Sequence, residues 1–189
     1  MDPLDKLIQS RIAGSLDAIG SLPNQTNAID AIVTALTKTL ETGGTIYTCG
    51  NGGSAAQAMH LAEELIGRYR ADRRPLRAVC LNADPTAITC IGNDFGFDEI
   101  FARQASALLR PADALLVFST SGVSANINKV LDAARALGAS AIGLLGKTGG
   151  AALAKCDHAL VIASDDTAHI QEAHQVVLHL ILEVIESSL

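Results

Sequence analysis

The sequence predicts an α/β protein with a doubly wound, mainly parallel five-stranded sheet and a helical hairpin at the N-terminus. Two patterns support this fold class: short apolar runs rich in β-branched residues, and longer segments between them with apolar side chains at helical spacing. Such runs are typical of strands covered on both faces, and their alternation with helices predicts βαβ units. The five expected strands are residues 45–49, 77–81, 114–119, 141–145 and 159–163.

Helical spacing predicts the other elements. Residues 4–20 and 25–42 form the expected hairpin, because Pro23 and Asn24 between them favour a turn. Five further helices are expected at 54–69, 97–109, 124–137, near 150–155 and at 167–188.

One domain, residues 1–189, accounts for all of these elements, since neither a linker nor a repeat interrupts them. Residues 1–42 are interpreted as a helical extension and residues 45–189 as the α/β core. Because such a sheet does not need the extension as cover, we expect the hairpin to pack against another subunit.

Composition excludes several classes of protein. The 189 residues are 49% hydrophobic and 18% charged with a net charge of -6, which fits neither a disordered chain nor an electrostatic nucleic-acid binder. Aromatic residues make up 3% and tryptophan is absent, which excludes an aromatic stacking platform for single-stranded nucleic acid. We expect no nucleic-acid partner.

Cysteine usage and the N-terminus predict the compartment. The four cysteines form no C-x-x-C pair and lie in or beside apolar segments, as buried thiols do in a reducing compartment. The opening M-D-P-L-D-K lacks the order of a signal peptide, and no apolar run approaches the ~20 residues of a membrane span. We expect a cytoplasmic protein without a membrane partner.

The first expected strand ends in a glycine-rich turn, C-G-N-G-G-S-A-A at 49–56. This formally matches the G-x-G-x-x-A dinucleotide fingerprint, which also needs an acidic residue at the end of the next strand. Asp84 lies three residues beyond that strand and directly before a proline, so nucleotide binding is not favoured. A tight turn explains the glycines, but it does not explain Asn51 and Ser54 beside them.

The third expected strand ends in a turn rich in hydroxyl groups, S-T-S-G-V-S-A-N at 119–126. Ser119, Thr120, Ser121 and Ser124 surround a glycine where a helix begins, and free N–H groups at a helix N-terminus favour an anion. Helix capping accounts for one or two of these hydroxyls. The remainder predict a phosphate-binding turn that uses no lysine.

The fourth expected strand runs into Gly146, Lys147 and Thr148 and fits a relaxed P-loop pattern from residue 141. The four intervening residues, I-G-L-L, are apolar strand, whereas a P-loop needs a flexible loop whose backbone faces the phosphates. We reject ATP hydrolysis.

Two expected helices carry side chains suited to acid–base or metal chemistry. His60 and Glu64 are four residues apart and share one helical face. On the last helix, Gln171 and His179 are separated by about 12 Å with an angular offset of about 80°, so they share a ligand only through long side chains or between subunits. Each histidine alone, His174 included, is more typical of a core; together with Glu64 they indicate a site.

The sequence resembles the phosphoheptose isomerase family, whose members have the sugar isomerase (SIS) fold. The resemblance covers nearly the whole chain. It is carried by C-G-N-G-G-S at 49–54, M-H-L-A-E-E-L-I-G-R-Y at 59–69, G-N-D-F-G-F-D-E-I-F at 92–101, S-T-S-G at 119–122, L-G-K-T-G-G at 145–150 and I-Q-E-A-H at 170–174.

This resemblance implies a reversible aldose–ketose conversion between sedoheptulose 7-phosphate and D-glycero-D-manno-heptose 7-phosphate through an enediol. That reaction is the first step toward the ADP-heptose from which bacteria build lipopolysaccharide. Glu64 and His179 correspond to the catalytic pair of the family. The family forms homotetramers with active sites at subunit interfaces, which suits the distance between Gln171 and His179.

The resemblance also implies ligand sets. One zinc ion per subunit is expected, with the ligands His60, Glu64, Gln171 and His179. The substrate-binding residues by family motif are Asn51, Gly52, Gly53, Ser54, Glu64, Asn93, Asp94, Ser119, Thr120, Ser121, Ser124 and Gln171.

Two positions depart from the family pattern. Val123 stands where a polar residue is usual, which removes a hydrogen bond near the phosphate turn. His169 replaces an Arg or Lys before I-Q-E, which implies a weaker or pH-sensitive cationic contact near the substrate.

Two rival functions fit parts of the sequence. A non-catalytic SIS relative binds the replication initiator protein as a tetramer, but it lacks the equivalents of Glu64 and His179, which are both present here. An isomerase or sensor for another sugar phosphate would share the same phosphate turn, and only residues lining the sugar would distinguish it.

Overall fold

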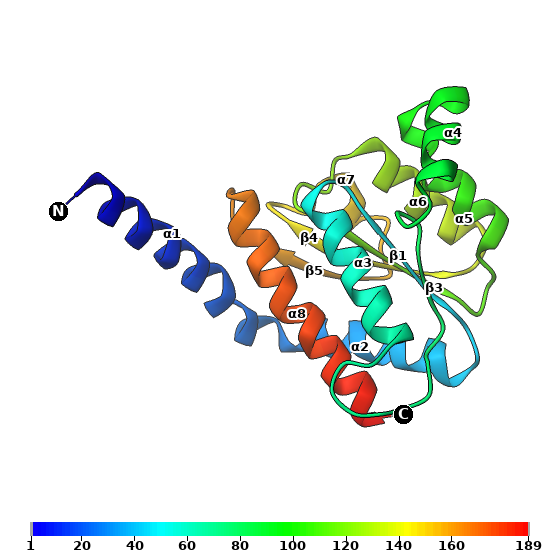
Figure 1. Cartoon of the computed structure of the whole chain (residues 1–189), viewed down its shortest axis with the longest axis horizontal. Coiled ribbons are helices and arrows are strands. Elements are labelled where there is room, and N and C mark those ends of the chain that lie inside the picture. The colour runs from blue at the N-terminus through cyan, green and yellow to red at the C-terminus, as the bar shows by residue number, and fades with distance from the viewer. Residues whose placement is uncertain (1, 189) are drawn as a thin grey trace.

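A computed structural model describes residues 2–188 (Figure 1). Its sheet contains β1 (Ile46–Gly50), β2 (Ala78–Cys80), β3 (Ala114–Ser119), β4 (Ser140–Gly146) and β5 (His158–Ile162). All paired strands are parallel, in the order β2-β1-β3-β4-β5. The five expected strands and the α/β class are confirmed.

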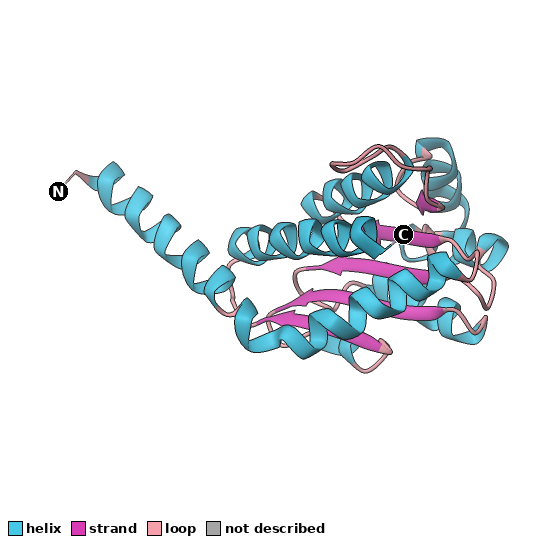
Figure 2. Cartoon of the chain, turned by 90° about the horizontal axis from the view of Figure 1, so that it is seen from below, coloured by secondary structure: helices cyan, strands magenta, loops and turns pink. Residues whose placement is uncertain are grey.

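Helices connect the strands and cover both sides of the sheet (Figure 2). They are α1 (Pro3–Gly20), α2 (Thr26–Glu41), α3 (Gly53–Ile66), α4 (Pro85–Phe95), α5 (Ala102–Leu108), α6 (Ala125–Ala136), α7 (Gly150–Leu153) and α8 (Thr167–Ser188). Short 3-10 turns, η1 (Leu22–Gln25) and η2 (Phe97–Glu99), precede α2 and α5. None of these described helices has the length and apolar content that a bilayer crossing requires.

Two apolar clusters, one on each face, hold the sheet between its helices. Along β3, Leu116 and Phe118 belong to the cluster with α2, α3 and α8, whereas Leu115 and Val117 belong to the cluster with α5 and α6. All six residues of β3 are buried, because helices cover the strand on both sides.

The two N-terminal helices lie where the sequence predicts them, but only the first forms an extension. Ile32 and Leu36 of α2 are fully buried in the cluster with α3 and α8, so α2 covers the sheet instead of forming part of an extension. Only α1 leaves the body of the protein, passing beside α8 (Figure 1). It exposes the apolar side chains of Leu4, Leu7, Ile8, Ile12 and Leu16.

Helix α4 was not predicted. It begins directly after Asp84, whose carboxylate accepts hydrogen bonds from the N–H groups of Thr86 and Ala87 at 2.8 and 3.0 Å. Asp84 is therefore a helix cap followed by a proline at the first helical position, and this pair was the available signal. No residue of α4 is buried.

The cysteines are free thiols with differing exposure. Cys49 and Cys80 are buried and Cys156 is half-buried, as expected, but Cys90 is exposed on α4. Burial raises the pKa of Cys156 to about 12 and also raises the pKa of Cys49, which keeps both as unreactive thiols.

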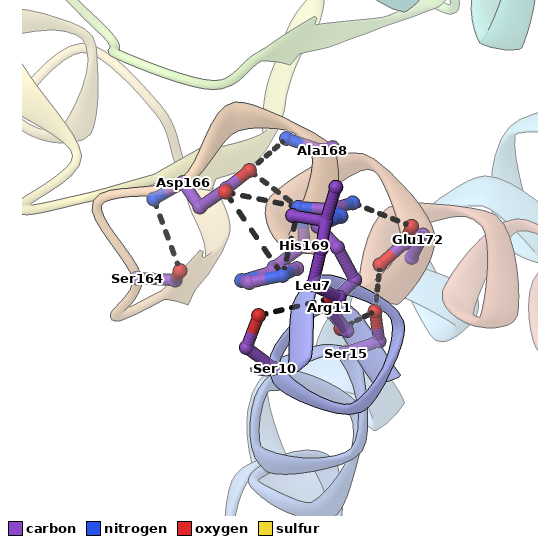
Figure 3. Close-up of polar contacts among 9 residues, drawn as sticks. All are labelled: Leu7, Ser10, Arg11, Ser15, Ser164, Asp166, Ala168, His169 and Glu172. Carbon is purple, nitrogen blue, oxygen red and sulfur yellow. Dashed lines mark hydrogen bonds and ion pairs between the residues drawn. The ribbon is translucent and has the colours of Figure 1, made fainter. Parts of the chain in front are cut away.

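A polar cluster ties α1 to the start of α8 (Figure 3). Arg11 donates to Asp166 at 2.9 Å and to Glu172 at 3.3 Å, and its Nη1 lies 2.9 Å from Nε2 of His169. His169 therefore faces α1 and Asp166. A Cβ atom on Gly14 would lie 2.1 Å from the His169 ring, so this close approach requires glycine.

Gly14→Ala tests this packing. Alanine gains about 1 kcal/mol of helix propensity over glycine, but overpacking costs about 1–3 kcal/mol. We expect a net loss of about 1 kcal/mol in the free energy of unfolding by urea, at one fixed protein concentration. In a His169→Ala background the same substitution should instead stabilise by about 1 kcal/mol. Stabilisation in both backgrounds would contradict the contact.

Candidate active site

The turn after β1 brings the start of α3 close to α8. Gly52 has a φ of +56°, which a glycine adopts without strain. At Gly53 a Cβ atom would lie 2.5 Å from Nε2 of Gln171, so the glycine lets the α8 side chain approach the turn. Gly53 and Gln171, both expected in the substrate site, therefore lie together.

Amide side chains fix this turn against its neighbours. Asn51 and Asn126 donate to one another's side-chain oxygens at 2.9 and 2.8 Å, which joins the β1 turn to the first residues of α6. Asn82 binds both the N–H and the carbonyl of Gly50, at 3.1 and 3.0 Å. The β1 turn and the α6 N-terminus thus form one rigid edge of the site.

The hydroxyl-rich turn after β3 lies at this same edge. Ser119 is buried, and its Oγ accepts a hydrogen bond from the N–H of Gly122 at 3.0 Å, while Ser121 Oγ accepts from Val123 at 3.4 Å. Gly122 has a φ of +65° and packs against the backbone of Gly149. Ser124 precedes the first residue of α6 but makes no capping hydrogen bond, so its hydroxyl is available to a ligand.

His60, Glu64 and His179 come together between α3 and α8. Nε2 of His60 lies 3.4 Å from Oε1 of Glu64, and the side chains are 33% and 20% exposed, which leaves both accessible to a ligand. The rings of His60 and His179 have centroids 5.5 Å apart at 80°. Three of the four expected zinc ligands therefore converge within one subunit.

Two residues of this cluster were missed by the sequence interpretation. Nε2 of Gln175 lies 3.0 Å from Nδ1 of His60 and 3.1 Å from Nε2 of His179. Tyr69 stacks on the His179 ring with centroids 5.7 Å apart. Helical spacing was a signal for Gln175, since it lies midway between Gln171 and His179 on one face of α8.

The end of α8 holds Tyr69 in place. Glu186 accepts hydrogen bonds from the backbone N–H groups of Tyr69, Arg70 and Ala71, the latter two at 3.0 Å each. Its carboxylate also pairs with Arg73 at 3.2 Å. These contacts fix the segment that follows α3 and carries the stacking ring.

Other expected site residues lie elsewhere. Asn93 and Asp94 are exposed on α4, where Asn93 donates to Asp94 at 2.8 Å, and the described contacts do not join them to the phosphate turn. Val123 is 65% exposed and offers the turn no polar side chain. The amide of Gln171 faces Gly53, not the histidines.

The chemistry of the donor set fits a divalent metal. His60 and His179 bring two imidazole rings together beside the carboxylate of Glu64. His60, Glu63 and Glu64 also offer ligand atoms within 4.8 Å of one another. Imidazole and carboxylate groups are typical zinc ligands, and the same groups can transfer protons.

Comparison with known proteins identifies the family of this chain. Residues 13–146 match the family model for the SIS domain. A phosphoheptose isomerase from Trichlorobacter lovleyi is 47% identical over 154 residues, which cover 82% of this chain and 79% of that protein. One from Campylobacter concisus is 40% identical over 185 residues, or 98% of each. This chain belongs to the phosphoheptose isomerase family.

A solved structure supports this family assignment. The phosphoheptose isomerase from Francisella tularensis has a TM-score of 0.94 to this chain and 37% sequence identity, with coverage of 99% and 100% of the two chains. Membership of the phosphoheptose isomerase family confirms the SIS fold that the motifs implied.

His174 is a core residue and generates a prediction about acid stability. It is fully buried, and its Nε2 lies 3.0 Å from the carbonyl oxygen of Leu145. Burial lowers the pKa of His174 from 6.5 to about 4. Between these values the unfolded state binds more protons than the folded state, so stability falls as the pH drops from 6.5 to 4.

The free energy of unfolding is expected to fall by on the order of 3 kcal/mol between pH 6.5 and pH 4. Urea unfolding of the wild type and of His174→Gln at pH 7.5, 5.5 and 4.5 measures it. The variant should lose less stability than the wild type on acidification. Parallel losses in both proteins would contradict the assignment of this proton to His174.

Proposed function

We propose that this chain is a phosphoheptose isomerase that interconverts sedoheptulose 7-phosphate and D-glycero-D-manno-heptose 7-phosphate, the first step of ADP-heptose synthesis for lipopolysaccharide. One observation carries the proposal. The acid–base groups Glu64, His60 and His179 converge between α3 and α8, and the N-terminus of α3 lies at the same sheet edge as the hydroxyl turn. A substrate with a phosphate at one end and a carbonyl at the other fits this arrangement.

The hydroxyl turn binds the phosphate in this proposal. Ser119, Thr120, Ser121 and Ser124 offer hydroxyl groups, and the α6 N-terminus adds backbone N–H groups and the positive end of the helix dipole. Such a site needs no lysine, which is consistent with a chain of net charge -6.

Glu64 acts as the base in the isomerisation. It removes a proton from C1 of the ketose, the carbonyl electrons pass to O2, and an enediol forms. The proton then returns at C2, so the carbonyl moves to C1 and no atom is lost. His179 transfers the accompanying proton between O1 and O2. Tyr69 holds the His179 ring by stacking.

A zinc ion is part of the proposal. His60, Glu64 and His179 would hold it, with Gln171 as the fourth ligand that the family pattern implies. When bound, zinc polarises a carbonyl oxygen and stabilises negative charge on an enediolate.

We also propose a homotetramer with active sites at subunit interfaces, located in the cytoplasm. The exposed apolar side chains of α1 support assembly, and so do Met59 and Ile66, which are 47% and 50% exposed on α3 beside His60. Asn93 and Asp94 are exposed on α4 and are therefore available to a substrate bound at a subunit interface.

The non-catalytic rival is less consistent with this site. The SIS relative that binds the replication initiator lacks the glutamate and the final histidine, whereas here both side chains contribute to one cluster. An isomerase for another sugar phosphate would differ only in its substrate, and assays with different sugar phosphates distinguish it.

Incubation with sedoheptulose 7-phosphate tests the activity. Purified protein should form the heptose 7-phosphate, more slowly after chelation and faster again with added zinc. Glu64→Gln should lower kcat by about 10²–10⁴-fold, because the amide cannot accept the proton. Glu41→Gln, at an exposed position at the end of α2, is a matched control outside the proposed machinery and should retain activity. Lack of turnover under every metal condition would refute the function.

Assembly is tested by placing charge on α1. The wild type should have a solution mass four times the 19.6 kDa of one chain. Leu7→Asp with Ile12→Asp should lower this mass, because burying carboxylates without partners is costly. Light scattering after size exclusion measures it. A monomeric wild type would contradict the proposal, and so would a double variant that remains tetrameric.

A further inference from the structure

We propose that Arg73 and Glu186 are positioning residues for the groups of the candidate active site at the end of α3. The two side chains form an ion pair, with Nε of Arg73 3.2 Å from Oε1 of Glu186. Arg73 binds the backbone of Glu64 in the last turn of α3. Glu186 binds the backbone of Tyr69, just beyond that helix. The meaning of these contacts for the reaction rests on the proposed function, in which Glu64 is the base and Tyr69 holds the ring of His179.

Arg73 supplies hydrogen bonds that the end of α3 lacks. The helix ends at Ile66, and the last four carbonyl groups of a helix have no partner within it. Nη2 of Arg73 donates to the carbonyl oxygen of Glu64 at 2.8 Å, and Nη1 donates to that of Leu65 at 3.0 Å. A positive charge at this end also opposes the helix dipole. Arg73 therefore keeps the turn that carries the proposed base from fraying.

Glu186 orders the segment between α3 and Arg73. Residues 67–74 form neither helix nor strand, so their N–H groups need partners outside regular secondary structure. Three successive N–H groups, those of residues 69–71, donate to the Glu186 carboxylate at 3.3, 3.0 and 3.0 Å. The hydrogen bond from Ala71, with those of its neighbours, lowers the pKa of Glu186 and keeps it ionised. One carboxylate thus fixes the backbone on either side of Arg70.

The geometry of α8 relates Glu186 to His179. Seven residues separate them, which is about 10.5 Å along the helix with an angular offset of about 20°, so both lie on one face. The Tyr69 ring stacks on His179 with centroids 5.7 Å apart and an interplanar angle of 24°. The segment is therefore held at two points on this face, by its backbone at Glu186 and by its ring at His179.

The two positioning residues depend on each other. The side chains of Arg73 and Glu186 are 11% and 9% exposed, so removing one partner leaves the other charge with little water around it. The guanidinium group reaches the carboxylate and two helix carbonyls at once, which the single ammonium group of a lysine does not match. We therefore expect a change in either residue to disturb both Glu64 and Tyr69.

Tyr69 provides a spectroscopic test that does not depend on activity. The chain has two tyrosines and no tryptophan, and Tyr47 lies in the apolar cluster on the other face of the sheet. In a Tyr47→Phe background, the tyrosine band of the near-ultraviolet circular dichroism therefore reports on Tyr69 alone. Glu186→Gln and Arg73→Lys should each lower this band by about half or more, because the segment opens locally. An unchanged band in a folded variant of either residue would overturn the proposal.

Asp113→Asn is the matched control for a carboxylate that only stabilises the fold. Asp113 is 6% exposed and accepts hydrogen bonds from the backbone N–H groups of Thr45 and Arg110 at 2.8 Å each. It directly precedes β3, at the end of that strand opposite the hydroxyl turn. The control should lower stability toward urea but leave the Tyr69 band unchanged. Loss of the band in Asp113→Asn as well would show a general loosening and would overturn the positioning role.

Steady-state kinetics with sedoheptulose 7-phosphate supply the second readout. Glu186→Gln and Arg73→Lys should each lower kcat by about tenfold and change KM by less than about twofold, since the base is displaced while the hydroxyl turn is untouched. Asp113→Asn should keep the kcat of the wild type. An unchanged kcat, or a change in KM alone, would overturn the positioning of Glu64. A wild type without turnover would instead refute the proposed function, and the Tyr69 band would still decide the structural role of the pair.

Discussion

The packing of α3 against α8 on one face of the sheet is the contact on which the candidate active site depends. Apolar side chains from both helices, including Leu61 and Val177, are fully buried in one cluster with the sheet. Gly53 permits close approach at one end of the contact. The polar groups farther along, His60, Glu64 and His179, are thereby held at fixed separations. Without this apolar packing, they would be isolated groups on two separate helices.

Short-range contacts explain how an acidic chain can bind an anionic substrate. The proposed phosphate contacts are hydroxyl groups and the N-terminus of α6, and these act over a few ångströms whatever the net charge. The Asn51–Asn126 amide pair joins this turn to the turn that opens α3. The hydroxyl turn and the turn that leads to His60 and Glu64 are thus linked through ordered backbone.

Sequence reasoning predicted the strands, because each is a short apolar run that stays buried on both faces, as β3 is. It missed α4 because Asp84 was weighed only as a nucleotide ligand, whereas it caps this helix directly before Pro85. It placed α2 outside the core, because an amphipathic stripe does not reveal which surface it will cover. The stripe of α2 covers this chain's own sheet, whereas that of α1 is left exposed.

The site was predictable in its residue types but not in its contacts. The spacing of His60 and Glu64 places them on one helical face, and the structure confirms their proximity. Gln175 could not be singled out, since its contacts with His60 and with Gln57 depend on the angle between α3 and α8. The contact between His169 and Arg11 was not predictable for the same reason, because the two residues are 158 positions apart in the chain.

Proton exchange at C1 of sedoheptulose 7-phosphate tests the central claim most directly, that Glu64 removes a carbon-bound proton to form an enediol. Proton NMR in D2O follows the C1 signals during repeated turnover. With the wild type, one C1 proton should be replaced by deuterium. With Glu64→Gln, the rate of this exchange should be lower by about 10²-fold or more. Retention of both C1 protons after many turnovers, or equal exchange rates in the two proteins, would contradict the account.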